Sequence, residues 1–156
     1  MQRKETQATM STKYSEKLFR QNFVRWFREY FPKDHIQSIE SEATSAGVPD
    51  INICKGGREV WVELKSGRLT TSSIKPGQYM WHTKRAQAGG TTWVVQRDED
   101  GVLCVFRGCR IKEFQDKPNS VVPDRKFSSA SRESRIKMFN YLVSQPYLEM
   151  DQLTFD

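Results

Sequence analysis

Two adjacent glycines, Gly56-Gly57, lie between two runs of residues that are typical of β-strands. A two-residue Gly-Gly loop in this setting is among the strongest short-range signals for a β-hairpin. The two runs cover residues 49–55 and 58–65, and the short loop sets the pairing between them. Counting outward from the loop, we expect Asp50 to lie opposite Glu63.

The hairpin divides its side chains between two faces, because side chains alternate along a β-strand. One face carries the charged residues Asp50, Glu63 and Lys65. We expect the opposite face to join the apolar core. Its residues are Ile51, Ile53, Val60, Val62 and Leu64.

The expected pair of Asp50 and Glu63 brings two like charges together, with Cβ atoms about 4.5–5.5 Å apart, which destabilises a sheet. A divalent cation such as Mg²⁺ would compensate, because it takes oxygen ligands from one or two carboxylates. Lys65 lies diagonally beside the pair, within reach of a long side chain. Two alternatives stay open. Either the face is simply solvated, or Lys65 forms a surface ion pair with Asp50, worth at most about 1 kcal/mol.

Length and charge narrow the class of protein. The chain has 156 residues, a formal net charge of +6 and a pI near 9.3. This length predicts one domain, and the positive charge favours an anionic partner, with nucleic acid as the leading candidate. No apolar run approaches a membrane span and no signal peptide is evident, so we expect no membrane partner and a cytoplasmic location. Three cysteines without CxxC spacing argue against a structural zinc site.

The N-terminal part of the chain predicts a tail, a helix and a strand. Residues 1–11 are polar, and we expect a flexible tail there. Aromatic residues recur at helical spacing over 12–30, which predicts a helix, and a strand follows over 35–43. Glu16 lies on the same side of this helix as the aromatic residues. It is either a first-turn acid stabilised by the helix dipole, by about 0.3–1 kcal/mol, or an acid directed into a functional site.

A second helix and two further strands complete the expected core. Pro76 is tolerated at the first helical position, and Gly89-Gly90 ends the helix near residue 88. Strands are expected over 91–96 and 102–106. The order helix, strand, strand, strand, helix, strand predicts an α/β domain with a mixed central β-sheet flanked by helices.

The C-terminal part is more polar and more basic. We expect a short helix over 110–114, a polar loop over 116–131 and a helix over 132–143. We therefore divide the chain into the tail, a core domain over 12–115 and a basic extension over 116–156, packed on the core or extending it. Five cations of the extension form either a DNA-contacting patch or only a flexible basic surface. They are Arg125, Lys126, Arg132, Arg135 and Lys137.

The segment Gly47-Val48-Pro49-Asp50, followed after twelve residues by Glu63-Leu64-Lys65, resembles the motif of the PD-(D/E)xK nuclease superfamily. The run through Gln96, with Gln78 opening the second helix and Ala88-Gly89-Gly90 closing it, is most similar to the VRR-NUC family, found in phages and repair proteins. The resemblance covers roughly residues 12–97. A bare PD…ExK string occurs by chance, and the hairpin register and the flanking helices are what make the resemblance specific.

The resemblance implies a restriction-endonuclease-like core that hydrolyses phosphodiester bonds with one or two divalent ions, Mg²⁺ or Mn²⁺. Lys65 would orient or help deprotonate the attacking water. Gln78 is either a helix-start residue or a support for Lys65 or the scissile phosphate. The resemblance assigns metal binding to Asp50, Glu63, the main-chain carbonyl of Leu64, and Glu16.

Other residues of the second helix allow two interpretations. Lys75, Lys84 and Arg85 could hold backbone phosphates without reading sequence. His82 lies one turn beyond Gln78 on the same face, so it could approach the substrate, but we expect an ordinary surface or half-buried histidine. We expect Trp61 and Trp81 in the core rather than as platforms for base stacking.

The function expected from this reasoning is a metal-dependent DNA endonuclease that selects a branch, flap or end, because a small domain has little room for a base-reading module. One alternative is a catalytically silent nucleic-acid-binding module with the same fold, and another is RNA hydrolysis. A homodimer is expected by analogy, since two active sites would face two strands. Phage origin, and hence the host cytoplasm, would fit the compact size.

Overall fold

The computed structural model describes residues 2–39 and 47–144. Three α-helices, six strands and two 3₁₀ helices follow one another along this part of the chain. In chain order they are α1 (Gln2–Tyr30), β1 (His35–Ser38), β2 (Ile51–Lys55), β3 (Arg58–Ser66), α2 (Pro76–Gln87), β4 (Thr92–Arg97), β5 (Val102–Arg107), η2 (Gly108–Phe114), η3 (Pro118–Ser120), β6 (Arg125–Ser128) and α3 (Arg132–Ser144).

The six strands form one sheet in the order β1-β2-β3-β4-β5-β6. Only the pair β3 and β4 is parallel. Parallel neighbours need a long crossover, which α2 provides here. The predicted α/β class, with a mixed central sheet, flanking helices and the order αβββαβ, is therefore confirmed.

The predicted hairpin register is confirmed from the Lys55–Arg58 pair at the turn to the Ile51–Val62 pair. Gly56 and Gly57 have φ values of 59° and 76°. Tight two-residue hairpin turns require such positive values, which glycine adopts without strain. The ladder ends at Ile51, so the backbone of Asp50 lies just outside it.

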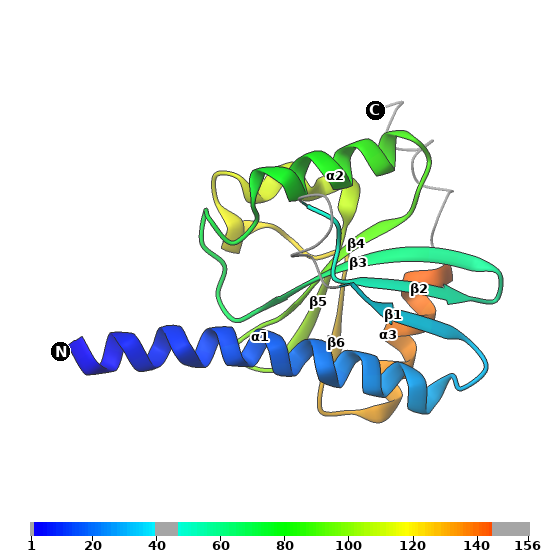
Figure 1. Cartoon of the computed structure of the whole chain (residues 1–156), viewed down its shortest axis with the longest axis horizontal. Coiled ribbons are helices and arrows are strands. Elements are labelled where there is room, and N and C mark those ends of the chain that lie inside the picture. The colour runs from blue at the N-terminus through cyan, green and yellow to red at the C-terminus, as the bar shows by residue number, and fades with distance from the viewer. Residues whose placement is uncertain (1, 40–46, 145–156) are drawn as a thin grey trace.

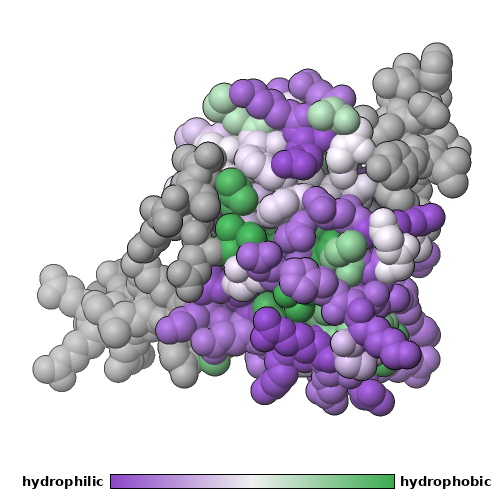
Figure 2. All heavy atoms as spheres, turned by 45° about the vertical axis from the view of Figure 1, so that its right-hand side comes forward, coloured by the Kyte–Doolittle hydropathy of each residue, from purple (hydrophilic) through white to green (hydrophobic). Residues whose placement is uncertain are grey.

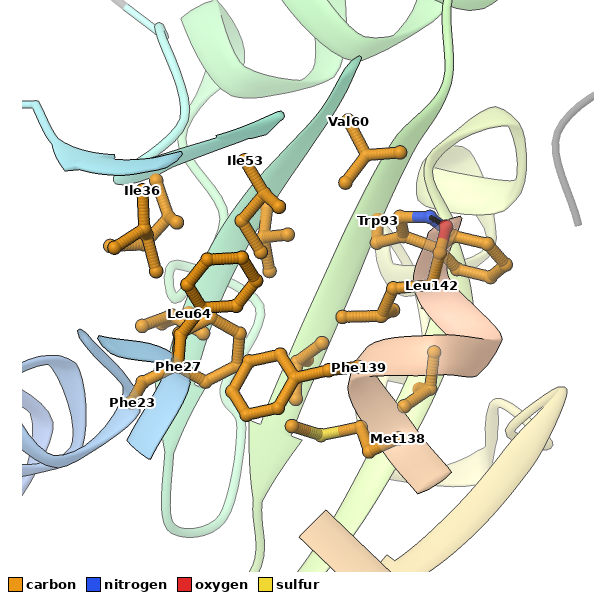
Figure 3. Packing of buried hydrophobic residues seen from close by; sticks show 14 of the residues in the cluster. Phe23, Phe27, Ile36, Ile53, Val60, Leu64, Trp93, Met138, Phe139 and Leu142 are labelled. Carbon is orange, nitrogen blue, oxygen red and sulfur yellow. Dashed lines mark hydrogen bonds between the residues drawn. The ribbon is translucent and has the colours of Figure 1, made fainter. Parts of the chain in front are cut away.

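Helices cover both faces of the sheet, with α2 on one side and α1 and α3 on the other (Figure 1). The main core lies under α1 and α3, where aromatic rings meet the apolar side of the hairpin (Figure 3). Phe139 of α3 packs against Phe23 and Phe27 of α1, with ring centroids 4.9 and 5.4 Å apart. Under α2 and η2 lies a smaller cluster, made of Leu69, Ile74, Tyr79, Val94, Cys104, Phe106, Ile111 and Phe114.

Two boundaries differ from the sequence predictions. Helix α1 begins at Gln2, whereas we expected this helix to cover 12–30. That residues 1–11 form a flexible tail stays a prediction. The loop expected over 116–131 contains the strand β6, whose four residues are mostly exposed and give no apolar alternation. This segment is a strand because it pairs with β5, and the local sequence alone does not reveal that pairing. Residues 40–43 of the expected first strand, and the end of the basic extension beyond 144, lie outside the described residues.

None of the helices in the described part of the chain is both long and apolar enough to span a lipid bilayer. The face that Figure 2 brings forward is mostly hydrophilic, with only small apolar patches.

Candidate active site

Strand β3 carries the two residues at the centre of the candidate site. Glu63 and Lys65 share the face of β3 that α2 covers, and they are 2% and 6% exposed. Lys65 Nζ lies 3.4 Å from Glu63 Oε1. The predicted common face is confirmed, whereas the alternative of a simply solvated face is wrong, because both side chains are buried.

Gln78 of α2 connects this pair to the helix start. Its amide Nε2 donates to Glu63 Oε1 at 2.9 Å, and its Oε1 accepts from Lys65 Nζ at 3.5 Å. The same Oε1 accepts from the backbone N–H of Lys75 at 2.9 Å, which satisfies a donor at the helix start. Both open interpretations of Gln78 therefore hold at once: it caps α2, and it supports Lys65 and Glu63.

Asp50 is held beside the site by the backbone of β3. Its Oδ2 accepts from the N–H of Leu64 at 2.9 Å. In a strand, the N–H and C=O of one residue point to the same side. The carbonyl of Leu64 is therefore directed past the end of β2, toward Asp50, as the predicted ligand set requires.

The approach to Asp50 depends on a close backbone contact. Gly47 has φ +93°, and a Cβ at this position would lie 2.0 Å from the carbonyl oxygen of Gly77 at the start of α2. Only glycine fits there without a shift of the backbone. The Gly-Val-Pro-Asp segment is thereby packed against the helix that supplies Gln78.

Burial and the neighbouring charge of Asp50 both disfavour the ionised form of Glu63. Its pKa is raised well above the usual 4.5, first by burial and then by the nearby carboxylate of Asp50, while Lys65 acts in the opposite direction. Its second oxygen, Oε2, is buried and receives no hydrogen bond from a donor group of the described residues, while a side-chain hydrogen bond with Asp50 adds to the rise of the pKa. A buried carboxylate oxygen without such a donor, beside a second carboxylate, is a place where a cation would be stabilised.

Glu16 also reaches this region. Its side chain is half-buried, and burial raises its pKa above the usual value. Lys65 opposes this rise and Asp50 adds to it, so both lie close enough to act on Glu16. Glu16 thus lies within the electrostatic reach of Lys65 and Asp50, and both of its interpretations stay predictions.

The residues present fit a hard divalent ion. Within residues 2–39 and 47–144, no group of three or more His, Cys, Asp or Glu side chains could hold a metal. Mg²⁺ does not require such a group, because it keeps several waters and binds through one or two carboxylates and substrate phosphates. Asp50, Glu63 and the carbonyl of Leu64 supply a donor set of this kind.

His82 is a buried neighbour of the site that sequence reasoning placed wrongly. It is 0% exposed rather than at the surface, and its Nδ1 lies 2.9 Å from the hydroxyl of Thr92. Burial, with a smaller effect of Lys65, lowers its pKa to about 4, so the ring is neutral at pH 7. The signal available in the sequence was its spacing of one helical turn from Gln78.

The structure separates the predicted phosphate-binding residues into two groups. Lys75 lies at the start of α2, beside the site, and Lys84 and Arg85 lie in its last turn. The cations of α3 belong to the opposite side of the sheet, where Arg132 lies over Tyr30 and Lys137 pairs with Glu133 of its own helix.

The remaining members of the basic extension also lie away from Glu63 and Lys65. Arg135 lies over Trp26, 4.8 Å from the ring centroid. Arg125 of β6 lies over Tyr141, while its neighbour Lys126 is on the other face of the same edge strand. The extension thus does not converge on the site as one patch, and a role in binding DNA stays a prediction for each of its cations.

Comparison with known proteins adds little to this description. No family model matches the chain, and no curated protein matches it. One similar solved structure is Hjc, a Holliday junction resolvase from the archaeal hyperthermophile Archaeoglobus fulgidus. Its sequence is 16% identical, the match covers 56% of this chain and 76% of that one, and the TM-score is 0.40. Proteins this distant can perform different chemistry, so function has to follow from the site itself.

Proposed function

We propose that this protein is a divalent-metal-dependent DNA endonuclease of the PD-(D/E)xK type, with a VRR-NUC-like arrangement of its motif. The observation that carries the proposal is the state of Glu63. This carboxylate is buried next to Asp50, with one oxygen bonded to Gln78 and the other without a donor group among the described residues. Two carboxylates beside the single ammonium group of Lys65 cost stability when both are ionised, and a bound divalent cation would offset that cost.

Each residue of the site has a distinct part in this proposal. Asp50, Glu63 and the carbonyl of Leu64 would hold Mg²⁺ or Mn²⁺, and Glu16 would hold the ion or its waters. When bound, the ion polarises the phosphoryl oxygen and lowers the pKa of water.

The ammonium group of Lys65 would orient the attacking water and offset the charge that develops on the phosphate. Gln78 keeps this ammonium in place through its contact of 3.5 Å. The burial of both Glu63 and Lys65 excludes bulk water and strengthens these interactions.

DNA with a branch, flap or end is the substrate we propose. The net charge of +6 favours a polyanion, and phosphate contacts supply affinity without sequence information. Lys75, Lys84 and Arg85 lie on α2, which covers the active-site face, and they are the cations best placed to contact the phosphates around the cleaved bond. A homodimer would present two such sites to two strands.

The test is cleavage of plasmid and branched DNA in Mg²⁺ or Mn²⁺ by the wild-type protein and by Asp50→Asn, Glu63→Gln and Lys65→Met. These substitutions preserve shape and remove charge, so the fold should be retained. We expect each to lower the cleavage rate by about 10²–10⁴-fold, as the loss of a group acting in the transition state does. Arg28→Ala, an exposed cation on the opposite side of the sheet, is the control that should cleave normally.

Two results would contradict the proposal. DNA binding without cleavage of any substrate by the wild-type protein would indicate a silent binding module instead. Cleavage of RNA at a rate equal to or above that of DNA would replace the proposed substrate.

A further inference from the structure

A cluster of aromatic and cationic side chains extends the active-site face of β3. Trp61 lies two positions before Glu63 on the same face, about 7 Å along the strand. Trp81 of α2 packs against it with ring centroids 5.4 Å apart and an interplanar angle of 61°. Arg85 lies over both rings, 5.6 Å from Trp61 and 4.7 Å from Trp81. We call these three residues the tryptophan cluster.

The tryptophan cluster is not part of the core, contrary to the sequence expectation. Trp61 and Trp81 are half-buried and Arg85 is exposed. The other two tryptophans, Trp26 and Trp93, are 8% and 1% exposed and belong to the main core. Among the described residues, neither hydrophobic cluster includes Trp61 or Trp81. Large aromatic surface is therefore kept partly accessible beside the candidate site.

A small pocket opens beside Trp61 and Arg85 of the tryptophan cluster, whereas Trp81 packs against Trp61 without lining the pocket. Its volume is about 400 Å³, and Trp61, Arg85 and Arg58 line it together with the glycines Gly57 and Gly90. This volume lies at the low end of the range for small-molecule sites, so it suits one planar group rather than a duplex or a helix.

The lining of the pocket suits a flat ring held beside a cation. Arg85 borders it with an exposed side chain, and Arg58 also lines it, with a guanidinium group that donates to the main-chain carbonyl of Val143 at 3.1 Å. Glu59, a further lining residue, accepts a hydrogen bond from the indole N–H of Trp61 at 3.0 Å, which holds that ring at the pocket. Bases stack on aromatic rings and on guanidinium planes regardless of sequence, and cations nearby hold the backbone phosphate.

We propose that the tryptophan cluster binds an unpaired nucleotide of the DNA strand that is cleaved at Glu63 and Lys65. This inference rests on the proposed nuclease function and specifies its substrate as DNA in which a strand leaves the duplex beside the cleaved bond. Bases within a duplex are stacked on both sides and cannot occupy the pocket.

The alternative is that Arg85 serves only to hold α2 against β3. In that case, its loss would affect the binding of all DNA substrates equally.

The first test is binding of a flapped duplex and of a blunt duplex of equal length, measured by fluorescence anisotropy in the Asp50→Asn background so that no DNA is cut. We expect Arg85→Ala and Trp61→Leu each to weaken binding of the flapped DNA by about tenfold, as for loss of one stacked base, and binding of the blunt DNA by less than about twofold. Arg28→Ala removes the same charge from α1 and should change neither. Equal losses on both substrates, or no loss on flapped DNA, would overturn the inference.

A second test uses the wild-type protein and a more conservative variant, and it detects the tryptophans directly. A base that stacks on an indole quenches its fluorescence, and Trp26 and Trp93 are too buried to be reached. A thymidine oligonucleotide should therefore quench the wild-type emission, and the double variant Trp61→Phe/Trp81→Phe, which keeps aromatic rings in place, should lose this quenching. Quenching that persists in the double variant would overturn the inference, and so would stronger quenching by a uridine oligoribonucleotide.

The two proposals can fail separately, because neither binding test contains a cleavage step. Selective binding of flapped DNA by a protein that cleaves nothing would retain the tryptophan cluster as a nucleotide site and remove the nuclease function. Cleavage without any preference for an unpaired strand would retain the nuclease function and remove the tryptophan cluster as a nucleotide site.

Discussion

On strand β3, Val62 and Leu64 face α1 and α3, while Glu63 and Lys65 face α2, and all four side chains are buried. On the first face, burial is complemented by aromatic rings that fill the space. On the second face, burial leaves a carboxylate with one oxygen that receives no hydrogen bond from the described residues and a second carboxylate nearby. The comparison teaches that equal burial has opposite electrostatic consequences on the two faces of a strand: one face is filled by apolar side chains, and the other holds ionisable groups whose charged forms are disfavoured.

The largest effect expected on the stabilising face comes from Phe139, whose ring contacts Phe23 and Phe27. We expect Phe139→Ala to lower the free energy of unfolding by about 3–5 kcal/mol, because it leaves a cavity among aromatic rings. Urea denaturation measures the change. A loss below about 1 kcal/mol would show that this face is not the main source of stability.

His82 gives the next largest effect, and it depends on pH. Its pKa is about 4 in the folded protein, against 6.5 ordinarily, so the unfolded chain takes up the proton first as the pH falls. Stability is therefore fully present above pH 6.5 and is lost between 6.5 and about 4, by about 3 kcal/mol in total. In His82→Gln, unfolding measured at pH 4.5 and 7.5 should differ by less than in the wild type.

The exposed histidine His35 provides the matched control for this measurement. If His35→Gln and His82→Gln reduced the acid sensitivity equally, the neutral buried state of His82 would not be its cause.

A divalent ion should stabilise the protein through Glu63. Because the pKa of Glu63 is raised above 4.5 in the folded protein, the metal-free protein loses stability as the pH rises from 4.5 to that raised pKa, since the unfolded chain releases this proton first. At pH 8, Mg²⁺ or Mn²⁺ at one hundred times its Kd should restore about 2.7 kcal/mol, seen as a rise in Tm. The same rise in Glu63→Gln would place the ion elsewhere.

The smallest effect is expected from substitution of Gln78, which contacts Glu63 and Lys65 on the polar face of β3. Removing a group that orients residues of a metal site typically costs about 10–100-fold in activity or metal affinity. We therefore expect Gln78→Ala to lower kcat within this range and to leave KM nearly unchanged, because Gln78 positions Lys65 and Glu63 without contacting substrate. Gln87→Ala, an exposed glutamine at the other end of α2, is the control. Equal activity of the two variants would contradict the positioning role.

Much of the fold followed from local patterns in the sequence. The Gly56-Gly57 turn predicted the hairpin register, and the proline at the start of α2 and the glycines after it predicted its limits. Strand β6 escaped prediction because its four residues are mostly exposed and form an edge, so only pairing with β5 defines them. Trp61 and His82 were placed wrongly for a related reason, since their burial depends on how α2 lies over β3.

By itself, the sequence determined which side chains share a face, since the alternation of side chains along a strand is a local property of the backbone. Asp50, Glu63 and Lys65 were therefore identifiable from their spacing. Only the tertiary structure decided what this face became. The packing of α2 over β3 buried Glu63, brought Gln78 to it and raised its pKa, and such effects arise from contacts between segments distant in the chain.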